Sequence, residues 1–242
     1  MADQPLSGQR VVITGGAGGV GRETAARMVA AGARVISADI PGAERHAAGS
    51  TPFAGDLARQ DEIERLFALV DAELGGLDIL VACAGLPSDS LMDISNDGWR
   101  QVIDANLVSY VGCAKPAIER IRENGREAEA IRGQVILVGS ISVHIKAVGE
   151  SVYNASKGGV ALFAETLRKE MIAEKIRVTL IEPGAIATHL QPYDDARLAE
   201  FEKGLEMLPA GEVAEAILFA ATRPPGVDVV TLRIEPLNQK IY

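Results

Sequence analysis

Cysteine and long apolar runs are both scarce in this sequence. Cys83 and Cys113 are the only cysteines among 242 residues, and both lie in apolar surroundings, which argues against a disulfide framework and fits a reducing compartment. No window approaches the run of about 20 apolar residues that a bilayer-spanning helix needs, so we expect no membrane span. Residues 1–10 are polar and lack the pattern of a secretion signal. These features predict a cytoplasmic protein.

Basic residues are fewer than acidic residues in this sequence. Lys and Arg total 24 against 33 Asp and Glu, which gives a formal net charge of −9. An acidic surface repels a phosphate backbone, so we expect no nucleic-acid partner. The histidines, His46, His144 and His189, are scattered and show no ligand spacing with the cysteines, so we predict no metal site.

Strand-like apolar runs alternate with helical patterns along the whole chain. Gly32 follows the helical pattern of 21–31, and we expect it to end that helix as a left-handed cap. The polar stretch 123–132 is expected to be a surface loop. Strands are expected over 10–14, 34–39, 51–54, 77–82, 134–139, 177–182 and 227–234, and helices over 21–31, 61–74, 99–122, 151–174 and 211–222.

This alternation predicts the fold class. Parallel strands joined by helices require right-handed crossovers. The chain shows no internal repeat or shift in composition, and its length suits one α/β domain. We therefore predict a single Rossmann-type, doubly wound α/β domain with a seven-stranded parallel sheet.

A glycine-rich loop joins the first expected strand to the first expected helix. Glycines at 15, 19 and 21 leave no side chain to block a pyrophosphate from backbone N–H groups at the helix N-terminus. A tight structural turn is the alternative, but the position in the first βαβ unit favours dinucleotide binding. The predicted contacts in the loop are Gly15, Ala17, Gly18, Gly19, Val20 and Gly21.

Asp39 ends the second expected strand, close to the offset at which an acidic residue meets the adenosine ribose. The 2′-phosphate of NADP would bring like charge within a few ångströms of this carboxylate, at a cost of roughly 1–4 kcal/mol. No Lys or Arg stands beside Asp39 or within the glycine loop, so NAD is favoured over NADP. A solvated carboxylate at the end of a strand is the alternative. Asp56, after the third strand, has either a contact with adenine or a turn role.

Tyr153 and Lys157 lie one helical turn apart, and Ser140 ends the fifth expected strand. Free tyrosine, with a pKa of about 10, is a weak base at neutral pH. A neighbouring ammonium and a positive nicotinamide ring both stabilise the tyrosinate. The Ser140 hydroxyl is suited to donate a hydrogen bond to a substrate oxygen. Taken together with the glycine loop and Asp39, these three residues predict proton exchange coupled to hydride transfer.

The chain resembles the short-chain dehydrogenase/reductase family from about Val11 to Ile234. The order and spacing of the matching pieces are those of the family, including Ser140 thirteen positions before Tyr153. The pieces are the loop 14–21, Asp56-Leu57, Ala84-Gly85, Asn106, Ser140, the segment 153–157, Pro183-Gly184 and Thr188.

The resemblance implies a role for each matching residue. Tyr153 is the general acid/base, Lys157 lowers its pKa and binds the nicotinamide ribose, and Ser140 orients the substrate oxygen. Asn106 holds a water that continues a proton relay. Further implied cofactor contacts are Asp56, Leu57, Ala84, Gly85, Pro183, Gly184, Ile186 and Thr188. The family commonly forms tetramers through its two long helices and last strand, so we expect a homotetramer or homodimer.

The sequence departs from the family pattern at two places, and its substrate contacts are less defined. Ala82-Cys83 replaces the usual asparagine pair, which puts local rigidity in doubt, and Gly139 replaces a serine without expected harm. His144 is either a substrate contact or an ordinary loop histidine. The segment 188–207 resembles a substrate lid, in which Leu190 and Tyr193 contact substrate or pack a short helix.

Together these features predict an NAD-dependent dehydrogenase of a secondary alcohol, with ketone reduction as the reverse. A carbonyl reductase acting on a 3-oxoacyl thioester is an alternative, although no basic cluster for a carrier arm is evident. A non-catalytic NAD(H)-binding sensor on the same fold is another. It would have no need of Tyr153, Lys157, Ser140 and Asn106 together.

Overall fold

Seven parallel strands form one sheet in the computed structural model, which describes residues 4–124 and 131–239. The predicted doubly wound parallel sheet is confirmed, in the order β3-β2-β1-β4-β5-β6-β9. The strands are β1 (Arg10–Thr14), β2 (Arg34–Asp39), β3 (Thr51–Ala54), β4 (Ile79–Ala82), β5 (Gly133–Val138), β6 (Ile176–Pro183) and β9 (Thr231–Ile234). A separate pair joins β7 (Ile186–Ala187) to β8 (Leu208–Pro209).

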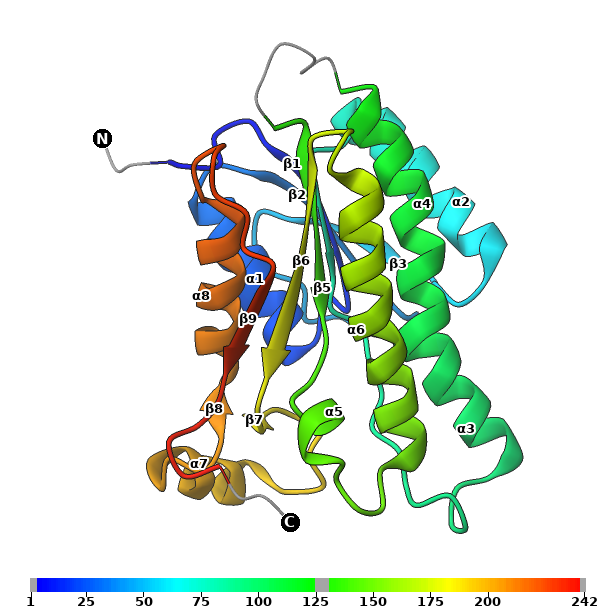
Figure 1. Ribbon diagram of the computed structural model, residues 1–242, viewed down its shortest axis with the longest axis vertical. Coiled ribbons are helices and arrows are strands. Elements are labelled where there is room, and N and C mark those ends of the chain that lie inside the picture. The colour runs from blue at the N-terminus through cyan, green and yellow to red at the C-terminus, as the bar shows by residue number, and fades with distance from the viewer. Residues whose placement is uncertain (1–3, 125–130, 240–242) are drawn as a thin grey trace.

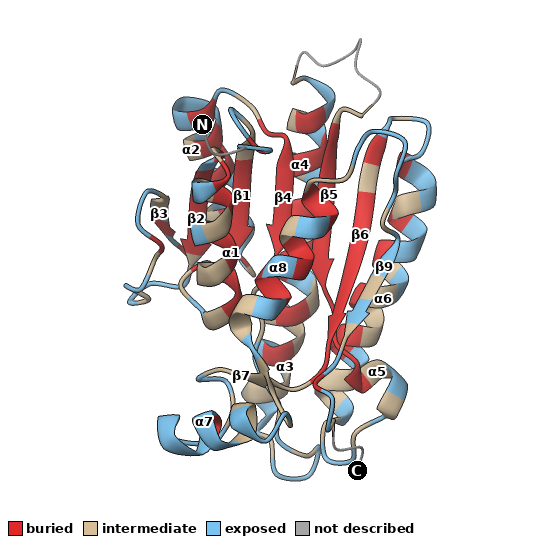
Figure 2. Ribbon diagram, turned by 90° about the vertical axis from the view of Figure 1, so that its left-hand side faces the viewer, coloured by how far each residue is buried: buried red, intermediate tan, exposed pale blue. Residues whose placement is uncertain are grey.

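Helices cover both faces of the sheet (Figure 1). On one face lie α1 (Gly19–Ala30) and α8 (Ala210–Ala221), and on the other α2 (Gln60–Leu69), α4 (Ser109–Arg122) and α6 (Ser151–Met171). Each face has its own buried apolar cluster. The central strands are buried on both sides (Figure 2), which explains their continuous apolar runs.

The longest helical stretch begins earlier than the sequence pattern predicts. α3 (Asn96–Ile103) continues through a π-helical turn, η2 (Asp104–Val108), into α4. The Ser95 hydroxyl caps its start by accepting from the Gly98 N–H. A second π-helical turn, η1 (Val70–Leu74), extends α2. The left-handed cap predicted at Gly32 is confirmed, with φ of 91°.

Some predicted boundaries change. Only 231–234 of the expected strand 227–234 pairs with the sheet. Two short helices, α5 (Ser142–Ile145) and α7 (Asp195–Lys203), are additional. Residues 125–130 of the expected loop 123–132 lie outside the described residues. Among the residues that are described, no helix has the length and hydropathy needed to span a membrane.

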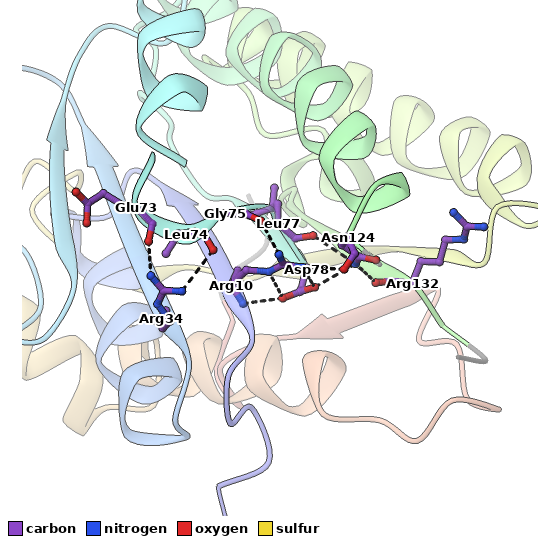
Figure 3. A network of polar contacts seen from close by, with 9 residues as sticks. All are labelled: Arg10, Arg34, Glu73, Leu74, Gly75, Leu77, Asp78, Asn124 and Arg132. Atoms are coloured by element: carbon purple, nitrogen blue, oxygen red, sulfur yellow. Dashed lines mark hydrogen bonds and ion pairs between the residues drawn. The ribbon is translucent and has the colours of Figure 1, made fainter. Parts of the chain in front are cut away.

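A buried ion pair fastens the amino-terminal edge of the sheet (Figure 3). Asp78, fully buried just before β4, accepts from the Arg10 side chain at 2.9 Å through each carboxylate oxygen. Asn124, after α4, donates to the same carboxylate at 3.1 Å and to the Arg132 carbonyl at 2.6 Å. The hydrogen bond with Asp78 raises the pKa of Arg10. The network joins β1, β4 and α4 at the opposite edge from the carboxyl ends of the strands.

Candidate active site

The predicted site residues gather at the carboxyl ends of the strands. β1 lies between β2 and β4, so the strand order reverses there, and such a reversal opens a crevice for ligands. The glycine loop follows β1, Asp39 ends β2, and Ser140 follows β5. Residues far apart in the sequence are thereby brought to one edge of the sheet.

The glycine loop is shaped by the protein's own packing as well as by ligand access. Gly15 has φ of 66°, and a Cβ there would lie 2.7 Å from the Ala84 Cα. A Cβ at Gly21 would lie 2.1 Å from the Gly15 carbonyl oxygen, and one at Gly19 would lie 2.7 Å from Thr188 Cγ2. The close-turn explanation of these glycines therefore holds together with the binding explanation.

The start of α1 fits a dinucleotide phosphate. Gly18 is its N-cap, and among the described residues no side chain caps this end, so the first backbone N–H groups are available to an anion. Ala17 lies in the turn before the helix, and Gly19 and Val20 are the first residues of α1.

Asp39 lies against this loop. Its Oδ2 accepts from the Ala17 N–H at 2.9 Å, and its Oδ1 accepts from the Ile40 N–H at 2.8 Å. The carboxylate is thus oriented beside the turn that would hold the pyrophosphate. Asp56 accepts from the Ala58 N–H at 3.0 Å, which is a turn role, and Leu57 is buried in the core.

The end of β4 is braced although it lacks the family's asparagine pair. Thr14 Oγ1 accepts from the N–H groups of Cys83 and Ala84 at 3.2 and 3.4 Å. Burial raises the pKa of the Cys83 thiol to about 12, so the thiol stays neutral. A Cβ at Gly85 would meet Asn106 Oδ1 at 3.4 Å and Lys157 Nζ at 3.5 Å, which places both side chains beside this strand end.

Asn106 is fully buried in η2 and fixes the segment after β4. Its side chain accepts from the Leu86 N–H at 2.7 Å and donates to the Leu86 carbonyl at 2.9 Å. It also donates to Ser156 on α6 at 3.1 Å. The side chain therefore positions the wall of the site, while its implied role in a proton relay stays a prediction.

Lys157 is buried beneath the site. Its ammonium donates to the Tyr110 hydroxyl at 3.2 Å and to the Val138 carbonyl at 3.0 Å, and lies 4.9 Å from the centre of the Tyr110 ring. Burial lowers the pKa of Lys157 to about 8. Tyr110 donates in turn to Ala84 and Val138 carbonyls. Tyr110 falls within the predicted helix 99–122, but its polar role was not predicted from the sequence.

Tyr153 and Ser140 come together as predicted, one from α6 and one from the turn after β5. A hydrogen bond with Ser140 lowers the pKa of Tyr153, but burial, the largest cause, and the charge of Glu150 raise it, and the net direction is upward. The lowering by Lys157 that the family resemblance implies stays a prediction, since the Lys157 ammonium here donates to Tyr110 and Val138.

Ser140 lies two residues before the short helix α5. Its Oγ accepts from the Ser142 N–H at 3.1 Å and from the Ser142 hydroxyl at 2.7 Å. Because the Ser142 hydroxyl donates to it, the Ser140 hydroxyl keeps its own proton to donate elsewhere. Sequence reasoning missed Ser142, whose position two residues after Ser140 was the available signal.

The segment after β6 lies next to this turn. The Pro183 carbonyl accepts from the Ile141 N–H at 3.0 Å, and the Gly184 N–H donates to the Ile234 carbonyl at 2.7 Å. Ile186 belongs to β7. Residues 188–207, the expected lid, connect β7 to β8 and carry α7.

The predicted substrate contacts are placed unequally. His144 binds Glu182 at 2.7 Å, a partner that the sequence did not predict. Tyr193 packs its ring on Phe201 of α7, with 5.1 Å between ring centres, which agrees with the packing alternative. Leu190 is exposed. Within 4–124 and 131–239, no three His, Cys, Asp or Glu side chains are grouped as metal ligands.

Comparison with known proteins agrees with this geometry. The short chain dehydrogenase family matches residues 9–198. Farnesol dehydrogenase of Aedes aegypti is 26% identical over 97% of this chain and 98% of its own length. A 3-oxoacyl-[acyl-carrier-protein] reductase of Synechocystis is 29% identical over 90% of this chain and 91% of its own.

A solved structure shares the fold. The ligand-free aldohexose dehydrogenase of Thermoplasma acidophilum aligns with a TM-score of 0.84 at 24% identity, covering 98% of this chain and 96% of that chain. Family and fold together imply a nicotinamide cofactor, NAD or NADP. The chain belongs to the short-chain dehydrogenase/reductase family of oxidoreductases.

Proposed function

We propose that the protein is an NAD-dependent dehydrogenase that transfers a hydride between NAD(H) and a secondary alcohol or ketone, with Tyr153 as general acid/base. The observation that carries the proposal is the interaction of the Tyr153 phenol with Ser140, at the edge of the sheet where the glycine loop also follows its strand. A phenol and a hydroxyl placed together are suited to hold one substrate oxygen from two sides.

The residues divide the proton chemistry between them. In alcohol oxidation the Tyr153 phenolate takes the hydroxyl proton, and in ketone reduction the neutral phenol returns it. Ser140 holds the substrate oxygen as its charge changes. Lys157 contributes positive charge from below and a donor for the nicotinamide ribose. The bound nicotinamide supplies the hydride acceptor or donor and, when oxidised, a further positive charge.

NAD, rather than NADP, is favoured by the position of Asp39. Its carboxylate is held against the Ala17 N–H, where the adenosine ribose of a bound dinucleotide would lie. The contacts implied for Asp56, Leu57, Ala84, Gly85, Pro183, Gly184, Ile186 and Thr188 belong to the same proposal. The free thiols of Cys83 and Cys113 support a cytoplasmic setting.

Two alternative functions differ from this proposal in substrate or in the absence of turnover. Reduction of a 3-oxoacyl thioester is the second candidate, supported by the similarity to the Synechocystis reductase. A non-catalytic NAD(H)-binding sensor would keep the glycine loop and Asp39 without turnover. Leu190 and Tyr193, both partly exposed on 188–207, are proposed as substrate contacts in either enzyme.

The test follows NADH absorbance with a panel of secondary alcohols, an aldohexose, farnesol and a 3-oxoacyl thioester. We expect turnover with at least one compound, and loss of at least about 100-fold in Tyr153→Phe, as for removal of a general acid/base. Undiminished activity in that variant would exclude the mechanism. Tight NADH binding without turnover on the whole panel would favour the sensor.

The direction of the Tyr153 shift also predicts a pH profile. Oxidation needs the phenolate, whose pKa is raised by burial, so the rate of oxidation should increase as the solution becomes alkaline, and this increase should weaken above about pH 8, where Lys157 loses its charge. Ketone reduction needs the neutral phenol, so the rate of reduction should fall over the same alkaline pH range. Initial rates in both directions between about pH 6 and 11 measure this, since the ordinary tyrosine pKa is about 10.

A further inference from the structure

A buried carboxylate beside the site has no role in the proposed chemistry. Glu182 precedes Pro183 at the end of β6, and its side chain is 4% exposed. One oxygen lies 2.7 Å from His144 Nε2, and the other lies 3.2 Å from Arg233 Nη2. A buried carboxylate is costly unless it is paired, and here two partners pair it.

The two partners connect Glu182 to different parts of the molecule. Arg233 lies directly across from it on β9, in register. His144 belongs to α5, the four-residue helix that starts two residues after Ser140. The Glu182–Arg233 pair therefore joins two strands, whereas the Glu182–His144 pair joins a strand to the catalytic turn.

α5 depends on outside contacts for its position. A helix of four residues is too short to be stable alone. The Ile141 N–H donates to the Pro183 carbonyl at 3.0 Å at its start, and His144 binds Glu182 near its end. The first residue of this helix, Ser142, donates to Ser140 Oγ through its N–H and its hydroxyl, so the position of α5 affects where the Ser140 hydroxyl lies.

The neighbouring Gly139 fits this arrangement. A Cβ at position 139 would lie 3.0 Å from Leu180 Cδ1 and 3.7 Å from Glu182 Cγ. The tight contact of such a Cβ is with Leu180, whereas its distance to Glu182 is that of ordinary packing, so Gly139 places this position directly beside the Glu182 side chain.

We propose that Glu182 is a positioning residue of this active site, which acts through His144 to hold α5 so that Ser140 meets Tyr153. Arg233 neutralises the carboxylate and is not part of the link to Ser140. The inference rests on the proposed function, and it assigns the Nε2 of His144 to Glu182 rather than to a substrate.

The test compares His144→Ala, His144→Gln and Arg233→Gln in the full-length protein. His144 and Arg233 side chains are 42% and 41% exposed, so these variants are matched in exposure. Gln at 144 carries an amide N–H at a reach similar to that of Nε2 and should restore the contact. Thermal unfolding confirms that each variant is folded.

The first measurement is independent of turnover. Tyrosinate absorbance near 295 nm is titrated for each variant, and the spectrum of the same variant carrying Tyr153→Phe is subtracted. Because the hydrogen bond with Ser140 lowers the pKa of Tyr153, loosening α5 should raise that pKa. We expect the rise in His144→Ala, a return toward wild type in His144→Gln, and no rise in Arg233→Gln.

The second measurement is steady-state kinetics with the best compound of the alcohol panel. His144→Ala should lower kcat by roughly 10- to 100-fold, as for a misplaced catalytic group, with the KM for NAD unchanged. Glu182→Gln, which removes the charge, should lower kcat in the same direction. The double variant Glu182→Gln/His144→Ala should have a kcat only slightly lower than that of either single variant, because the two residues act through one contact.

The outcomes separate this inference from the proposed function. If Tyr153→Phe retains full activity, the proposed function is wrong. If Tyr153→Phe is inactive while His144→Ala matches wild type in titration and kcat, only the positioning role is wrong. Equal losses of kcat in His144→Ala, His144→Gln and Arg233→Gln would overturn the positioning role and would show that the Glu182 ion pairs only stabilise the fold.

Discussion

At the scale of single residues, polar groups hidden in apolar segments were the hardest to predict. Residue type and spacing alone predicted the glycine loop, Asp39, Tyr153 and Lys157 as site residues. Tyr110 was not predicted in this way, because a tyrosine on the buried face of a helix is ordinary core. Only the fold shows that its hydroxyl receives the Lys157 ammonium. A lysine enclosed by a hydroxyl, a carbonyl and a ring keeps its charge through dipoles rather than through a carboxylate.

Asp39 supports a prediction at this scale. Asp39→Ser removes the negative charge beside Ala17, so NADPH should bind more tightly and NADH less tightly. We expect the ratio of the two dissociation constants to change by about 10-fold or more, equivalent to about 1.4 kcal/mol. Fluorescence titration with each reduced cofactor measures this ratio. Asp56→Ser is the matched control and should change it less.

If the control changes the ratio as much as Asp39→Ser, then Asp56 selects the cofactor together with Asp39. An unchanged ratio in Asp39→Ser would assign that carboxylate to the turn alone.

At the scale of elements, periodicity predicted the long pieces and missed the short ones. The strand 34–39 and the helix beginning at 151 were predicted within a residue, because burial on a sheet leaves a regular apolar pattern. α5 and α7 were not predicted by periodicity: α5 has only four residues and is tied to Glu182 on a distant strand, and α7 begins at an Asp194 cap in a segment without an apolar stripe. Neither π-helical turn was predicted from the sequence.

The outer faces of α4 and α6 carry the proposed subunit contact. Val111 on α4 and Leu162 on α6 are 44% and 70% exposed, although both are apolar. We propose that a second copy of the chain covers them. Leu162→Glu should shift the protein toward a smaller mass, measured by size-exclusion chromatography with light scattering. Leu205→Glu, at an exposed leucine of 188–207, should leave the mass unchanged.

A wild-type protein that elutes as a monomer at all concentrations would contradict the subunit contact. An unchanged oligomer in Leu162→Glu would place the contact on another face.

At the scale of the whole molecule, stability and chemistry occupy opposite edges of the sheet. The Asp78 network ties the amino ends of β1 and β4, whereas the site lies at their carboxyl ends. Asp78→Ala leaves the Arg10 guanidinium without its buried partner, which typically costs about 3–5 kcal/mol of unfolding free energy. Urea unfolding measures the loss. The kcat of the folded fraction should stay near wild type.

Asp61→Ala is the control for this prediction, since its pair with Arg59 is exposed and should not alter the urea midpoint. A kcat that falls together with stability in Asp78→Ala would show that the two edges are coupled.

The contact between Thr188 and the glycine loop has a consequence for the order of events in turnover. Thr188 Cγ2 lies where a side chain at Gly19 would be, so the first residue after β7 rests on the turn that receives the pyrophosphate. If 188–207 is the lid that the sequence predicts, we expect a dinucleotide to enter before this segment closes and to leave after it opens. The steady state should follow a compulsory sequence, with the nucleotide first on and last off.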